Sequence, residues 1–168
     1  LITAKSAPVF GGVYKLAAVE DEQGNIIPKI KISENTAKIT NPHYKKLYRF
    51  YDNESGKALA DELCVYDETI DSTKPHTIFD PDAIWKTKTL TDYTARELHV
   101  TVFKNGELVY KQPSLYEIRI YCAEQLETLW DEVKRFENPH TYYVDLSKKL
   151  WDIKNALLEK SKDGKDLK

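Results

Sequence analysis

The fold class of this chain is decided by the stretch Leu98-His99-Val100-Thr101-Val102-Phe103-Lys104-Asn105-Gly106-Glu107-Leu108-Val109-Tyr110. Two strand-like runs flank Asn105-Gly106, and both of these residues tolerate the positive φ angles of a type I′ turn. The pattern therefore predicts a β-hairpin. A few residues later the apolar period becomes that of a helix, which indicates an α+β fold.

The end of the chain has the pattern of two helices. Ser114 and Glu117 form a capping box, and apolar residues then recur at steps of three or four as far as Phe136. This predicts one helix of about six turns that ends at Asn138-Pro139. After an extended segment at residues 142–145, Ser147 can cap a second helix, whose apolar stripe is Leu150, Ile153 and Leu157.

The first part of the chain has strand and turn signals. Residues 13–19 and 26–32 flank a Gly- and Asn-containing turn and predict one hairpin. Residues 47–51 and 59–66 predict another, although residues 58–63 could instead form a helical turn. The acidic stretch at 67–82 contains two prolines, and we expect a long loop with a short strand at 77–79.

These elements suggest three segments. We expect a β segment at residues 1–52, a β-rich region with the acidic loop and the Asn-Gly hairpin at residues 53–112, and a helical region at residues 113–168. The fold is thus expected to consist of antiparallel strands and hairpins followed by two C-terminal helices.

Charge is distributed unevenly along the chain. The net charge is only −2, which argues against a general nucleic-acid binder. Six basic residues and one acid lie between Lys29 and Arg49, whereas nine acids and two lysines lie between Asp52 and Asp82. The basic stretch could bind a compact, phosphate-rich ligand. Alternatively, its lysines only mark the solvated face of a strand.

Composition also bears on the cellular location and the kind of site. No stretch has the roughly 18 apolar residues of a membrane span, and Cys64 and Cys122 are far apart, so we expect a soluble cytoplasmic protein. The chain contains no methionine, so we expect a fragment of a longer protein. The spacing of the four histidines does not favour a metal site, and His99 is expected to pack or hydrogen-bond within a strand.

Three blocks of sequence carry a family resemblance. Pro8-Val9-Phe10-Gly11-Gly12-Val13-Tyr14-Lys15-Leu16 closely resembles the segment that follows the phosphate-binding loop of nicotinate phosphoribosyltransferases. Lys31 to Arg49 resembles the next block of this family, and Asn138 to Leu150 resembles its C-terminal signature. Residues 98–119 also resemble the related nicotinamide-using enzymes, so a preference for nicotinamide stays open.

The resemblance implies the activity of a parent enzyme. Such an enzyme has an α/β barrel and a second α/β domain, acts as a homodimer, and joins nicotinate to phosphoribosyl pyrophosphate in NAD biosynthesis. The resemblance further implies that ATP, with Mg, is hydrolysed through a phosphohistidine. Both this histidine and the Gly-x-Gly-Thr phosphate loop are expected upstream of Leu1. We therefore expect the isolated chain to be inactive and to bind no cofactor by itself.

Three lysines are the candidate phosphate ligands. Lys15 ranks first because it follows the two glycines of the most family-like block, and Lys38 and Lys5 rank next. Each could instead be an exposed strand lysine. His43 stands where the family usually has glycine, so this loop need not keep the family's backbone conformation. A further alternative is a non-catalytic module that serves dimer contacts and structural support.

Overall fold

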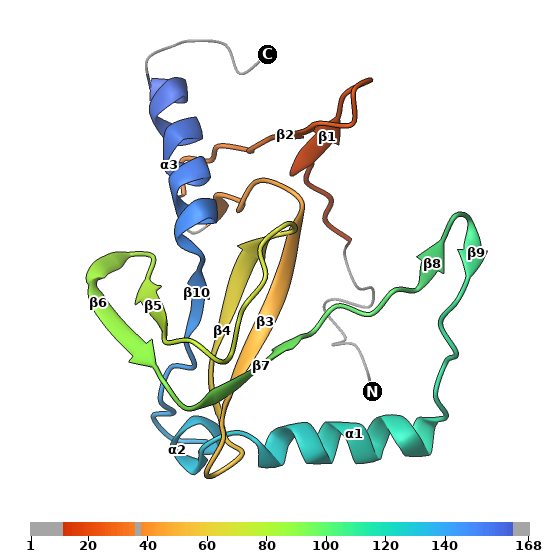
Figure 1. Cartoon of the computed structure of the whole chain (residues 1–168), viewed down its shortest axis with the longest axis vertical. Coiled ribbons are helices and arrows are strands. Elements are labelled where there is room, and N and C mark those ends of the chain that lie inside the picture. Colours follow the sequence, from red (N-terminus) through yellow and green to blue (C-terminus); the bar gives the residue numbers. More distant parts are fainter. Residues whose placement is uncertain (1–11, 36–37, 163–168) are drawn as a thin grey trace, which may run out of the picture. The chain divides into compact units, whose positions relative to one another are not determined.

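The computed structural model describes residues 12–35 and 38–162, which belong to two compact units (Figure 1). The smaller unit is formed by Leu1–Tyr44 and Ile153–Lys168, and the larger by Lys45–Asp152. Each unit is described by itself below. The three-segment division suggested by the sequence stays a prediction.

A four-stranded sheet forms the centre of the larger unit. The hairpin of β3 (Lys45–Asp52) and β4 (Ala58–Val65) is confirmed, and residues 58–63 form a strand rather than a helical turn. β7 (Tyr93–Glu97) pairs with β3, and β10 (Val144–Leu146) pairs with β4, which gives the order β10-β4-β3-β7.

The pairing of β10 corrects the expectation of antiparallel strands alone, because β10 runs parallel to β4. A parallel pair needs a long connection that returns the chain to the same end of the sheet. Five strands and two helices lie between β4 and β10 in the sequence, and they provide this connection.

A second hairpin completes the core of the larger unit. The strand predicted inside the acidic loop is confirmed as β5 (His76–Asp80), which pairs with β6 (Ala83–Leu90). The sequence did not reveal β6, because its residues between Ala83 and Leu90 are all exposed and show no apolar alternation. The buried core combines β3, β4, β5, β6 and β7 and consists of Tyr48, Phe50, Ala60, Cys64, Ile78, Leu90 and Tyr93.

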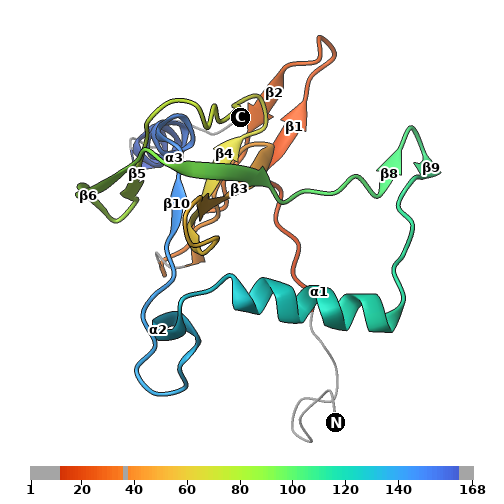
Figure 2. The same cartoon turned by 60° about the horizontal axis from the view of Figure 1, so that its bottom comes forward.

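The long helix predicted after Ser114 is interrupted (Figure 2). The capping box is confirmed, but α1 (Leu115–Glu127) ends nine residues before Phe136, and only the short α2 (Asp131–Lys134) follows. The backbone N–H of Ala58 donates to the carbonyl of Thr128 at 2.7 Å, and Lys57 Nζ donates to that of Glu127 at 2.7 Å. These contacts occupy the carbonyls of Glu127 and Thr128, which would accept helical hydrogen bonds if α1 continued.

The last helix, α3 (Lys148–Lys162), begins where the sequence predicts. Ser147 Oγ accepts a hydrogen bond from the backbone N–H of Leu150 at 3.2 Å, as a capping residue does. The same hydroxyl donates to Glu68 Oε2 at 2.7 Å, and the Leu150 side chain is fully buried. The start of α3 is therefore anchored in the larger unit.

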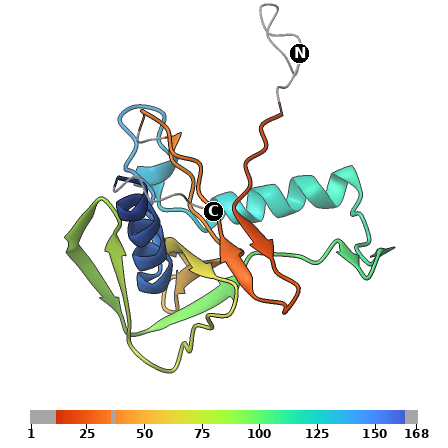
Figure 3. The same cartoon turned by 90° about the horizontal axis from the view of Figure 1, so that it is seen from above.

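The first predicted hairpin is confirmed in the smaller unit, with shorter strands (Figure 3). β1 (Ala18–Glu20) pairs with β2 (Ile26–Pro28). Asp21 Oδ1 accepts hydrogen bonds from the backbone N–H groups of Gln23 and Asn25, and Gly24 has a φ of 83°. The turn residues thus behave as their types predict.

The Asn-Gly hairpin is also confirmed, and its two turn residues have φ angles of 51° and 82°. Its strands, β8 (Phe103–Lys104) and β9 (Glu107–Leu108), are much shorter than the apolar runs around them. All four strand residues are exposed. This hairpin therefore has correct turn chemistry but contributes nothing to the core.

The loop at His43 has a backbone conformation that glycine favours. His43 has a φ of 78°, which lies in the left-handed region. Its Nδ1 atom accepts the backbone N–H of Tyr44 at 3.0 Å, and its own N–H donates to the carbonyl of Ala17 at 2.7 Å. Histidine adopts this conformation here because it is one of the residues that tolerate this region.

Candidate functional site

The structure brings two of the three candidate phosphate ligands together. Lys15 Nζ donates a hydrogen bond to the backbone carbonyl of Lys38 at 3.0 Å. Lys15 is half-buried, Lys38 is exposed, and neither forms an ion pair with any described acid. Lys5 lies outside the described residues. The Lys15 ammonium thus lies beside the backbone of Lys38, and the role of both lysines in phosphate binding stays a prediction.

A buried ion pair connects the two central strands of the larger unit. Arg49 donates to both carboxylate oxygens of Asp61, at 2.7 and 2.8 Å, and the hydroxyl of Tyr142 donates to Asp61 Oδ1 at 2.8 Å. The hydrogen bond with Asp61 raises the pKa of Arg49. Burial, together with the Asp61 charge, raises the pKa of Tyr142. Arg49 and Tyr142 therefore keep their protons, and their hydrogen bonds to Asp61 form a structural link.

A second buried cluster surrounds the next residue of the same strand. Glu62 is only 2% exposed, and its Oε2 atom lies 2.8 Å from His76 Nε2. The His76 ring stacks on Phe50 with centroids 5.2 Å apart. Cys64 Sγ lies 3.5 Å from Glu62 Oε2, and burial raises the pKa of this thiol. Cys64 thus stays protonated and is not suited to act as a nucleophile.

The sequence contains a signal for these clusters that the pattern reasoning missed. Asp61-Glu62 interrupts the otherwise apolar run Ala58-Leu59-Ala60 and Leu63-Cys64-Val65. Adjacent residues of a strand point to opposite faces of the sheet. Asp61 and Glu62 therefore each need a partner, one on each face of β4. Arg49 could have been found as one partner from the hairpin register, whereas His76 comes from a different hairpin.

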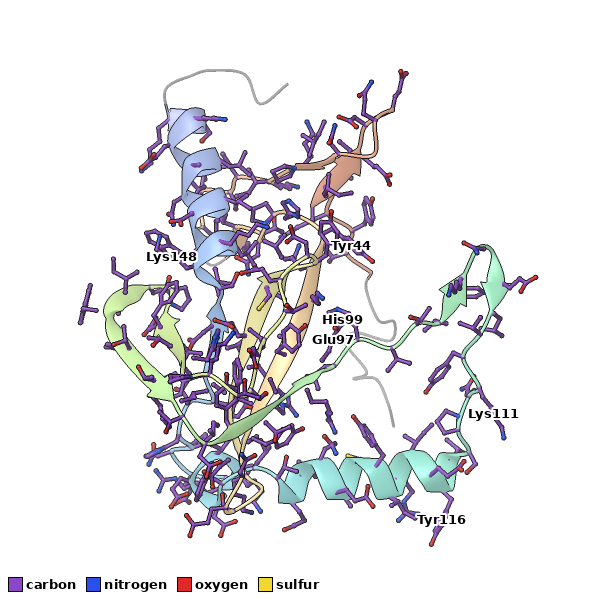
Figure 4. All side chains as sticks on the ribbon, viewed as in Figure 1. Tyr44, Glu97, His99, Lys111, Tyr116 and Lys148 are labelled. Atoms are coloured by element: carbon purple, nitrogen blue, oxygen red, sulfur yellow. The ribbon has the colours of Figure 1, made fainter. Side chains whose placement is uncertain are left out.

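The remaining histidines have structural contacts. His99 Nδ1 accepts the backbone N–H of Leu47 at 3.1 Å, which confirms the expected hydrogen bond, but His99 follows β7 and does not lie within a strand. Glu97, which pairs with Lys46 at 3.7 Å, lies near His99 at the end of β7 (Figure 4). Residues 12–35 and 38–162 contain no group of three His, Cys, Asp or Glu side chains that could hold a metal ion.

Asp145 is a buried acid without a favourable partner. It is 4% exposed and lies beside Glu62 in the register of β10 and β4. No hydrogen bond or ion pair joins its carboxylate to any described side chain. Burial raises the pKa of Asp145 to about 6, and the negative charges of Glu62 and Asp80 act in the same direction.

This environment leads to a pH-dependent stability. The free energy of unfolding of the chain, relative to that of Asp145→Asn, is expected to fall by about 2–3 kcal/mol between about pH 4 and pH 7. In this window the folded state holds the Asp145 proton more tightly than the unfolded state, so stability decreases as the pH rises. Urea unfolding of both proteins at both pH values measures the difference. If the two proteins differed by the same free energy of unfolding at both pH values, this expectation would be contradicted.

The buried ionic groups Arg49–Asp61 and His76–Glu62 thus help to maintain the structure of the larger unit, which is an α+β module. None of the helices in the described ranges is long and apolar enough to cross a membrane.

Comparisons with known proteins identify the family. The sequence profile of the nicotinate phosphoribosyltransferase C-terminal domain matches residues 44–154. The chain is 38% identical over 154 residues to nicotinate phosphoribosyltransferase of Bacillus subtilis, covering 92% of this chain and 31% of that protein. It is 32% identical over 176 residues to the Dictyostelium discoideum protein of the same name, covering 100% of this chain and 29% of that protein.

A solved structure agrees with the sequence matches. The crystal structure of human nicotinic acid phosphoribosyltransferase aligns with a TM-score of 0.64 and 26% identity over 71% of this chain and 24% of that chain. The chain belongs to the nicotinate phosphoribosyltransferase family and corresponds to the C-terminal portion of its members.

Proposed function

We propose that this chain serves as the C-terminal portion of an enzyme that joins nicotinate to phosphoribosyl pyrophosphate, forming nicotinate mononucleotide and pyrophosphate for NAD biosynthesis. The observation that carries this proposal is the 38% identity to a nicotinate phosphoribosyltransferase across 92% of the chain. The proposed parent is a cytoplasmic homodimer with an α/β barrel, and it couples ATP hydrolysis to the transfer through a phosphohistidine.

The isolated chain is inactive in this proposal. Phosphoribosyl transfer needs preorganised cations and backbone N–H groups around the departing pyrophosphate. This sequence contains no Gly-x-Gly-Thr loop to supply those N–H groups. The test is an assay for nicotinate mononucleotide with the 168-residue chain and with the full-length enzyme. Turnover by the full-length enzyme alone supports the proposal, and turnover by the isolated chain contradicts the inactivity.

Lys15 provides the sharpest test of a contribution to substrate binding. In the full-length enzyme, Lys15→Ala is expected to raise the KM for phosphoribosyl pyrophosphate by about 10- to 100-fold, the range of one lost hydrogen bond to a charged group. Lys15 and Lys38 would act as neighbouring point charges on the phosphates, since Lys15 Nζ already lies 3.0 Å from the Lys38 carbonyl. Steady-state kinetics at varied phosphoribosyl pyrophosphate measures the effect.

Two variants serve as controls for Lys15. Lys38→Ala is expected to raise the same KM by a smaller factor, because the Lys38 side chain is exposed. Lys104→Ala removes an exposed charge from β8 and is expected to change nothing. Unchanged kinetics in Lys15→Ala would remove this residue from the site.

A structural role is a second candidate function, and the exposed apolar surface of the larger unit favours it. α1 contains no buried residue, and even its large apolar side chains are exposed. Leu115 is 82% exposed and Tyr116 is 72% exposed. Figure 4 shows Tyr116 near the start of α1 and Lys111 on the segment that leads into this helix. Such surface is typical of an interface, and we propose that the remainder of the full-length polypeptide covers it. Monomeric light scattering of the isolated chain, without binding of a hydrophobic dye, would contradict this role.

A further inference from the structure

A cavity of about 210 Å³ lies in the larger unit beside the β5–β6 hairpin. Its walls are mainly apolar and are formed by Leu59, Ile78, Phe79 and Tyr143. Two acids, Asp145 and Asp80, and two lysines, Lys86 and Lys88, line the same space. Among these four charged residues only Asp145 is almost entirely buried.

Two acids lie near Asp145 and disfavour its ionised form. Glu62 lies directly beside Asp145 across the parallel pair of strands, and Asp80 also lines the cavity. Both are acids, and both contribute to the raised pKa of Asp145. Buried carboxylates in proteins are normally paired with a cation or with hydrogen-bond donors, so Asp145 is an exception to this rule.

The cations near the cavity have other partners or reach the solvent. His76 pairs with Glu62 at 2.8 Å, and Lys86 pairs with Asp80 at 3.7 Å. Lys86 and Lys88 line the cavity but are exposed, and no described cation lies within ion-pair distance of Asp145. Asp145 is therefore left without an ion-pair partner among the described residues, and the cavity beside it has room for a cation from another molecule or segment.

Size and chemistry narrow the class of ligand. An apolar cavity of about 150 Å³ is known to hold a molecule of the size of benzene, so this space fits a group of about five to eight non-hydrogen atoms. A divalent metal is disfavoured, because no three suitable ligand side chains meet among residues 12–35 and 38–162. Apolar walls suit an alkyl stem, and a single carboxylate suits one ammonium or guanidinium group.

We propose that this cavity binds a monovalent organic cation, an ammonium or guanidinium group on a short alkyl stem, with Asp145 as its counter-ion. The cation is either a free amine or the side chain of a lysine or arginine from another polypeptide segment. The site lies in the larger unit and is independent of phosphoribosyl transfer, so its failure would leave the proposed enzymatic function untouched.

The test is an NMR titration of the 168-residue chain with n-butylammonium chloride at pH 8. Saturable shifts of the backbone amides of Asp145 and Thr87 are expected, with binding at least tenfold weaker at pH 4.5, where Asp145 is protonated. Asp145→Asn is expected to weaken binding at least tenfold. Asp82→Asn is the matched control, because Asp82 is an exposed acid in the neighbouring turn, and it is expected to change nothing. Neutral n-butanol is expected to bind at least tenfold more weakly than the amine.

Further probes distinguish the two sources of the cation. Tighter binding of Nα-acetyl-lysine amide or Nα-acetyl-arginine amide than of n-butylammonium supports a polypeptide side chain, and the reverse order supports a free amine. Three results would overturn the proposal: the absence of saturable shifts, equal binding to wild type and Asp145→Asn, or equal binding of butanol and butylammonium. Asp145→Asn removes an unpaired buried charge, so it is expected to fold, and its amide spectrum verifies this.

Discussion

Arg49→Met is expected to lower the free energy of unfolding by about 3–5 kcal/mol, the range observed when one partner of a buried ion pair is removed. Asp61 has a side chain that is 6% exposed, and the substitution leaves it with the Tyr142 hydroxyl as its side-chain partner. Most of the loss arises from the uncompensated carboxylate rather than from the lost attraction. Urea unfolding at pH 7, monitored by tryptophan fluorescence, measures the change.

Two further variants test whether the loss of stability depends on the burial of the Arg49–Asp61 pair. Arg49→Met combined with Asp61→Leu is expected to recover most of the loss, because no unpaired charge remains. Lys149→Met breaks the pair between Lys149 and Asp67, in which both side chains are about half exposed, and is expected to cost less than about 1 kcal/mol. Equal effects of Arg49→Met and Lys149→Met would contradict the structural role of the Arg49–Asp61 pair.

Phe50→Ala is expected to destabilise the larger unit by about 3–5 kcal/mol, as truncations of large buried aromatic residues do. Phe50 is completely buried, and its ring contacts the rings of His76 and Tyr93 at centroid distances of 5.2 and 5.5 Å. The substitution opens a cavity between the sheet and the β5–β6 hairpin. Thermal and urea unfolding measure the loss.

Phe103→Ala is the matched control for Phe50→Ala. The Phe103 side chain is 65% exposed on β8, so its truncation is expected to change the free energy of unfolding by less than about 0.5 kcal/mol. A loss of similar size in both variants would indicate that the core does not lie where the structure places it.

Local signals in the sequence were sufficient for much of the fold. Asn105-Gly106 predicted its turn, Ser114 and Glu117 their capping box, and Ser147 the start of α3, because each signal acts within a few residues. The break after α1 could not be predicted in this way. It depends on Lys57 and Ala58, which are remote in sequence from the carbonyls that they bind.

The residues of the candidate site were likewise predictable only in part from the sequence. Lys15 and Lys38 were chosen from the sequence, but their proximity depends on the chain returning across 23 residues. The buried acids were missed because periodicity describes which residues are apolar and carries no information about the partner of a polar residue. Asp145 in particular acquires its unusual environment from β4, which lies far from it in the sequence.

The parallel pairing of β10 with β4 has a consequence for the order of folding. Arg49 and Asp61 are 12 residues apart and can meet as soon as the β3–β4 hairpin closes, whereas Tyr142 and Asp61 are 81 residues apart. Closing the longer loop costs more chain entropy, so β10 is expected to join after the folding transition state. Changes at Tyr142 should then mainly accelerate unfolding, and changes in the hairpin should mainly slow folding.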